Sequence, residues 1–160
     1  MTDKSSIQQI FGCLLKRPQL LSEVDKYSLT IGDFSSRFEK YVFSAICGLY
    51  HQGVTHIEPI DVANFLEVDT VGKKVFEQNN GIEFLQDVAE FSAVENFGYY
   101  YNRLKKINLL RDLKKQGFDT SVFYIEDLTS PNADEVNARF EELTVQDIGV
   151  GVKKKLLTLE

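Results

Sequence analysis

The segment that comes nearest to a phosphate-binding loop lies at residues 149–155. It reads Gly149-Val-Gly151-Val-Lys153-Lys154-Lys155 and so combines the glycines and lysines that such loops use. A Walker A loop has the form Gly-x-x-x-x-Gly-Lys-Ser/Thr after a buried strand, because backbone amides hold the phosphates and the hydroxyl group holds magnesium. No Gly-Lys-Ser/Thr occurs in this chain, and no strand is expected before the segment. We therefore predict no nucleotide site here.

Two cysteines and two histidines are the side chains that thiol or metal chemistry would use. Cys13 and Cys47 lie among apolar neighbours at helical spacing, which favours buried free thiols over a disulfide. His51 and His56 flank an expected turn and show neither Cys-x-x-Cys nor His-x-x-x-His spacing. No metal-ligating residue is predicted.

The remaining candidates for chemistry are aromatic and acidic clusters. Tyr99–Tyr101, followed by Arg103, are residue types that could stack on nucleic-acid bases. Successive residues of a helix point in different directions, however, so packing in the core and at an interface is the better interpretation. The adjacent acids at 134–135 and 141–142 are expected on a solvated helix face. No catalytic or cofactor-binding residue is predicted in this segment, which leaves open whether the whole protein is an enzyme.

The composition is that of a soluble globular protein. The 160 residues are 43% apolar and 26% charged, which suits one domain with an appendage. No apolar run of about 18 residues is present, so we expect no membrane span. The first residues lack the small-residue cleavage site of a secretory signal, and a cytoplasmic location is expected.

The charges are unevenly placed along the chain. The net charge of −6 disfavours nucleic-acid binding by the whole domain, because clustered lysine and arginine make most phosphate contacts. Residues 119–142 hold seven acids and one base, Arg139. Residues 103–115 hold one acid, Asp112, and six bases: Arg103, Lys105, Lys106, Arg111, Lys114 and Lys115. We expect these two stretches to attract each other, within one hairpin or between two protomers.

Apolar residues at helical spacing predict a series of helices in the first part of the chain. In the helix expected from residue 59, Pro59 occupies the first turn, and Ile60, Ala63 and Leu66 are expected to face inward. The helices and helical turns are expected over residues 6–16, 18–24, 38–53, from 59, around 71–76 and over 82–89.

A long helix of about 24 residues is expected next, closed by Gly117. It carries two apolar stripes, one with Phe97 and Tyr100 and one with leucines. A helix with two stripes must be covered twice, which indicates an assembly element rather than an active site. The hypothetical interface residues are Leu104, Ile107, Leu109, Leu110, Arg111, Leu113, Phe140 and Leu143.

The rest of the chain is predicted to form a connector, a helix and a linker. The stretch Val122–Ile125 could form a single strand, although no partner strand is evident. Asn132 and Glu135 predict a capping box for a helix with Val136, Phe140 and Leu143 on one face. We therefore predict an all-α protein: a compact helical bundle over 1–92, a helical hairpin over 93–145 and the start of a linker over 146–160.

Several short motifs, in this order and spacing, resemble the N-terminal domain of DnaB-type replicative DNA helicases. Asn80 stands where the family's "GG-x-x-YL" segment has its first glycine. The resemblance covers about residues 7–145. The matching positions are Ile10–Leu15, Pro18, Leu20-Leu21, Asp33-Phe34, Val42–Ile46, Leu49, Gly53, Ile60–Val62, Leu66, Gly81–Leu85, Asn96, Tyr100, Leu110-Arg111 and Gly117–Asp119.

The resemblance implies a non-catalytic oligomerisation and primase-docking domain that works in DNA replication as part of the primosome. It implies a homo-oligomer, either a dimer or part of a hexameric ring, with primase as partner and little direct DNA binding. Departures from the pattern suggest a divergent phage or mobile-element member. The family's motor domain, to which ATP and magnesium would belong, is not found in these residues. The alternatives are a stand-alone helicase adaptor or loader-like protein and a small DNA-binding protein that uses the basic helix.

Overall fold

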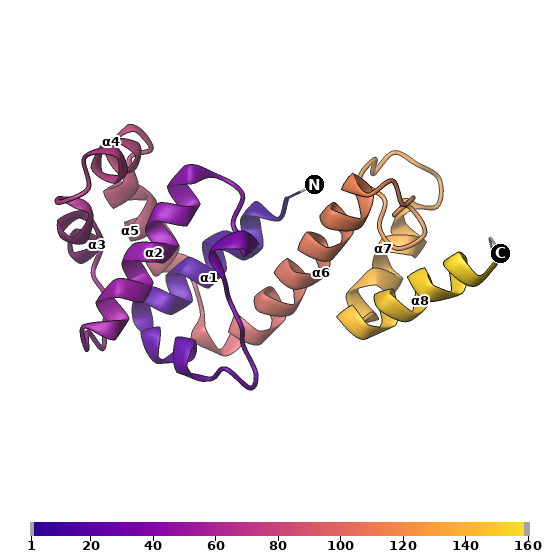
Figure 1. The fold of residues 1–160 in the computed structure, drawn as a ribbon, viewed down its shortest axis with the longest axis horizontal. Coiled ribbons are helices and arrows are strands. Elements are labelled where there is room, and N and C mark those ends of the chain that lie inside the picture. Colours follow the sequence, from indigo (N-terminus) through magenta and orange to yellow (C-terminus); the bar gives the residue numbers. More distant parts are fainter. Residues whose placement is uncertain (1, 159–160) are drawn as a thin grey trace. The chain divides into compact units, whose positions relative to one another are not determined.

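The computed structural model describes residues 2–158, in which helices are the only regular elements (Figure 1). This confirms the predicted all-α class. The chain forms two compact units, which we describe separately. The bundle unit is Lys4–Tyr101, and the C-terminal unit comprises residues 2–3 together with residues 102–158. No helix among the described residues has the length and apolar character that a membrane crossing requires.

The bundle unit contains five α-helices and three short 3₁₀ helices, and the expected helices up to residue 91 are all present. Their bounds are α1 (Lys4–Lys16), η1 (Pro18–Ser22), η2 (Ile31–Asp33), α2 (Arg37–His51), α3 (Pro59–Leu66), α4 (Thr70–Gln78), α5 (Gly81–Phe91) and η3 (Val94–Asn96).

Helices α1 and α5 lie in close contact at Gly12. A Cβ atom at this position would lie 2.2 Å from the Val88 carbonyl oxygen and 2.3 Å from Ser92 Oγ. Lys16, one turn further along α1, donates from Nζ to the Ser92 carbonyl oxygen over 2.6 Å. The glycine therefore lets the backbones of the two helices approach, and the lysine caps the end of α5.

Helix α2 begins at a capping box and ends before a glycine. The Ser36 Oγ accepts from the Glu39 N–H over 3.1 Å, and Glu39 Oε1 accepts from the Ser36 N–H over 3.1 Å. Lys4 Nζ lies 2.7 Å from the other Glu39 oxygen. Gly53 follows the helix with φ 93°, as the expected left-handed C-terminal residue.

The inward face of α3 differs from the prediction at Ile60, and Ala63 is only half-buried. Leu66 is buried as expected, together with Val62, but Ile60 is 56% exposed. Pro59 does stand at the first turn. Because Ile60 precedes Val62 by two residues, it lies roughly 200° away around the helix. The prediction for Ile60 was wrong, since the stripe continues through Val62 and not through Ile60.

Helix α6 (Phe97–Lys115) belongs to the C-terminal unit from Asn102 onward. The unit also contains α7 (Ala133–Glu142) and α8 (Val145–Thr158). Ile107 and Leu110 of α6, Phe140 of α7 and Ile148 of α8 form its buried cluster. Half-buried side chains surround it: Leu109, Leu113, Phe123, Tyr124 and Leu143. The linker expected over 146–160 is therefore wrong for residues 146–158, which belong to a helix that supplies part of this core. Residues 159 and 160 lie outside the described residues.

Two local predictions in this unit were wrong. Val122–Ile125 is a turn and an irregular segment rather than a strand. Asn132 is the N-cap residue of the expected helix, α7, but its side chain makes no hydrogen bond to the helix, so the predicted capping box is absent. A capping box occurs instead before α8, where Thr144 Oγ1 accepts from the Asp147 N–H over 3.0 Å and Asp147 accepts from the Thr144 N–H over 2.9 Å.

Candidate protein-interaction surfaces

The eight hypothetical interface residues divide into two groups by exposure. Four are fully buried within the chain, at 0–2% exposure: Leu104, Ile107, Leu110 and Phe140. The other four are half-buried: Leu109, Arg111, Leu113 and Leu143. Only the half-buried residues can contact another molecule without unfolding, so the accessible part of the hypothetical interface is limited to them.

The second apolar stripe of α6 is covered by the chain's own helices. Leu110 packs in one cluster with Phe140 and Ile148, so α7 and α8 together bury what a two-helix hairpin leaves open. No partner is therefore needed to cover this stripe, contrary to the prediction. An interface through the half-buried residues stays a prediction.

The basic stretch of α6 is largely engaged within the C-terminal unit. Lys106 is only 4% exposed, and its Nζ donates to the carbonyl oxygens of Phe140 and Glu141 over 2.8 and 3.3 Å. The ammonium lies 4.5 Å from the centroid of the Phe140 ring. Burial lowers the pKa of Lys106, and the nearby Arg103 charge lowers it further. Lys106 thus caps the C-terminal end of α7, where a cation is favourable.

Ion pairs join the basic and acidic stretches inside this unit. Attraction between the two stretches was predicted either within one hairpin or between two protomers. Arg103 binds Glu141 and also lies 3.0 Å from Asp3. Lys114 Nζ lies 2.9 Å from Glu126. The opposite charges therefore meet within one chain, and they fix the register of α6 against α7 and its connector.

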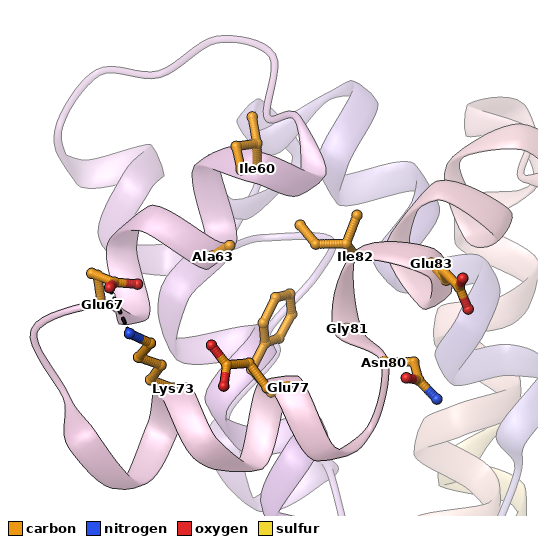
Figure 2. Close-up of a pocket in the computed structure, with 10 residues that line it drawn as sticks. Ile60, Ala63, Glu67, Lys73, Glu77, Asn80, Gly81, Ile82 and Glu83 are labelled. Carbon is orange, nitrogen blue, oxygen red and sulfur yellow. Dashed lines mark hydrogen bonds and ion pairs between the residues drawn. The ribbon is translucent and has the colours of Figure 1, made fainter.

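An apolar groove lies on the bundle unit between α3, α4 and α5, with a volume of about 340 Å³ (Figure 2). Its apolar lining comes from Ile60, Ala63, Phe76, Gly81 and Ile82, and its polar lining from Glu67, Lys73, Glu77, Asn80 and Glu83. Figure 2 shows Glu67 joined to Lys73, an ion pair of 2.7 Å. This volume lies at the lower end of the range for ligand sites. The sequence prediction missed this groove because it placed Ile60 in the core.

Two backbone features at the start of α5 shape the groove. Asn80 has φ 51°, the one positive value at a non-glycine residue in the described part of the chain. A Cβ atom at Gly81 would lie 2.1 Å from the Phe76 ring, so the ring rests directly on the Gly81 backbone. Together they hold Phe76 as the floor of the groove.

The cysteines are free thiols, as expected. Cys13 is buried and donates from Sγ to the Ala93 carbonyl oxygen over 3.3 Å, whereas Cys47 is half-buried. Burial raises the pKa of each thiol to about 11, so both stay protonated at neutral pH and are poor nucleophiles. His56 Nε2 lies 3.0 Å from Glu58, and no group of metal-ligating side chains occurs among the described residues.

Comparison with known proteins finds a prophage-derived relative. The SPbeta prophage-derived uncharacterized protein YorI of Bacillus subtilis (strain 168) is 35% identical over 161 residues, which cover 100% of this chain. The chain spans 32% of the length of that relative. The prophage origin of the relative fits the expectation of a phage or mobile-element member. No solved structure matches.

The family comparison covers most of the bundle and the first part of α6. A family model described as the DnaB-like helicase N terminal domain matches residues 5–106. This confirms the resemblance drawn from the motifs and implies a role related to replicative helicases. The chain belongs to the DnaB-like helicase N-terminal domain family.

Proposed function

We propose that this chain is a non-catalytic domain of a replicative DNA helicase that self-associates and docks primase. The family match over residues 5–106 is the observation that carries the proposal. Half-buried leucines of the C-terminal unit support self-association, because apolar side chains with partial exposure gain free energy when a second chain covers them. Complete burial of a leucine is worth roughly 1.5–3 kcal/mol.

The cytoplasm is the expected location of such a domain, and the catalytic steps would lie elsewhere. ATP and magnesium would be bound by a motor domain joined to this one in the same polypeptide. This chain spans 32% of its relative, and we propose that the relative's remaining sequence includes such a motor. A stand-alone adaptor or loader is the second candidate, and the reading frame beyond Glu160 decides between the two.

Sedimentation velocity over a micromolar concentration series tests self-association. We expect Leu109→Lys to weaken it, because Leu109 is half-buried and a lysine can keep its stem packed while it places a charge at the surface. Leu128→Lys is the matched control, since Leu128 is 70% exposed in the connector. Leu110→Asp is unsuitable because Leu110 is fully buried and its loss would unfold the unit.

Primase docking is tested by co-sedimentation with a purified primase from the same genome. We expect a complex that contains both proteins at micromolar concentration. If the chain self-associates but no primase co-sediments, the domain is an oligomerisation element alone. If Leu109→Lys stays folded and associates as the unsubstituted chain does, the half-buried leucines are not the interface.

A further inference from the structure

Helix α8 has a second, outward face that its own unit does not cover. Ile148 packs in the core, but Val150 is 53% exposed and Leu157 is 69% exposed. At about 100° per residue, Val150 and Leu157 lie within roughly 20° of each other on the helix surface. Lys153 and Lys154, both exposed, lie on either side of this line. The outward face of α8 is therefore a short apolar stripe between two lysines.

The groove on the bundle unit has the complementary chemistry. Its apolar lining is open to solvent, since Ile60 is 56% exposed. Three glutamates and one lysine line it, and Lys73 is already paired with Glu67 at 2.7 Å. Glu77, whose charge also acts on Lys73, and Glu83 are both exposed and can meet cations from outside. Figure 2 shows Ile60 and Ala63 facing Ile82 across the groove, with Glu77 below them and Glu83 beyond Ile82.

We propose that the groove between α3, α4 and α5 binds the outward face of α8 from a second copy of this chain. Val150 and Leu157 would enter the apolar groove, and Lys153 and Lys154 would meet Glu77 and Glu83. Each copy has one groove and one such helix, so two copies can exchange helices reciprocally about a two-fold axis, or further copies can add head to tail. The inference rests on the self-association proposed above and names one surface that produces it.

Charge reversal tests the pairing without disturbing either core, because all four charged residues are exposed. One variant carries Glu77→Lys and Glu83→Lys; the other carries Lys153→Glu and Lys154→Glu. Each variant alone sets like charges against each other, so we expect self-association to weaken by about tenfold or more. An equimolar mixture of the two variants restores both complementary contacts, and a chain with all four changes restores them in one species. Association in the mixture and in that chain should therefore return.

Two controls separate this contact from general effects of charge and exposed apolar surface. Asp25→Lys with Asp134→Lys changes the net charge by the same amount as the groove variant, at exposed positions outside both surfaces. It should leave association unchanged. Leu157→Ser should weaken association, whereas Val24→Ser, at a position 68% exposed, should not.

Sedimentation velocity, with circular dichroism to verify folding, gives the outcomes. Loss of self-association in each charge-reversal variant, and its recovery in the mixture, support the proposal. If the unsubstituted chain associates but both charge variants associate equally well, this contact is wrong and the proposed self-association stands on another surface. If the unsubstituted chain is monomeric at all concentrations, both the contact and the proposed self-association fail.

Discussion

Lys106 shows how one buried charge holds the end of a helix. Its ammonium serves the last carbonyl groups of α7 and lies over the Phe140 ring, so removal leaves two carbonyl groups without this donor. We expect Lys106→Met to lower the free energy of unfolding of the C-terminal unit by about 1–3 kcal/mol. Urea unfolding with hydrogen exchange of α7 measures this. The control is Lys115→Met, at an exposed position of α6, the helix that also carries Lys106. An equal loss of stability in this control would contradict the capping role of Lys106.

Asn80 shows why the family's first glycine can be replaced at this position. Its φ of 51° lies in the left-handed region, which glycine adopts freely and asparagine tolerates better than other residues. We expect Asn80→Gly to leave the stability of the bundle unit nearly unchanged, and Asn80→Ala to cost about 1 kcal/mol. Thermal unfolding of the two variants distinguishes them. Equal stability of the glycine and alanine variants would show that the left-handed conformation is not required.

At the scale of elements, the start of α2 gives a prediction about pH. Burial alone would raise the pKa of Glu39, but hydrogen bonds from Lys4 and from the N–H groups of Ser36 and Ser35 outweigh it and lower the pKa. The charged form is therefore favoured in the folded state. Its stabilisation is fully present above the pKa of the unfolded carboxyl group, about 4.3, and is lost as the pH falls through the lower folded pKa.

We expect Glu39→Gln to cost about 1–3 kcal/mol of unfolding free energy at neutral pH, because a charged hydrogen-bond acceptor is removed. The difference from the unsubstituted chain should shrink as the pH falls below about 4. Denaturant titrations at several pH values measure it. Glu90→Gln, at an exposed position of α5, should show no comparable change. A difference that stays constant down to low pH would mean that the side chain acts through packing alone.

The elements themselves follow from local patterns wherever periodicity and caps agree. Helices α1 to α5 could be predicted because apolar spacing, Pro59 and Gly53 all mark them. Helix α8 was not predicted, because Gly149 and Gly151 suggested a linker. The pattern Thr144-x-x-Asp147 could have shown its start. The exposure of Ile60 depends on how α3 packs against other helices, which single-sequence periodicity does not define.

At the scale of the whole molecule, the candidate surfaces were harder to predict than the fold. The two apolar stripes of α6 consist of residues that are packed tightly. Helical periodicity alone does not tell whether the chain itself or a partner covers these stripes. Leu110 is covered by the chain itself, because Ile148 of a third helix, α8, completes the cluster. The groove arises from three helices at once and has no signature in the order of residues. Surfaces that arise from tertiary packing can therefore be identified only from the structure.

The net charge of −6, together with the engagement of the basic helix, predicts weak binding to DNA. Lys106 is buried, and Arg103 and Lys114 are paired with acids of the same unit, so few of the cations on α6 can contact phosphates. We expect the chain to bind a labelled DNA duplex with a dissociation constant above about 0.1 mM at physiological salt. Fluorescence anisotropy at two salt concentrations measures this. Micromolar binding that weakens steeply with salt, and that is lost on Lys115→Ala, would instead assign the basic helix to DNA.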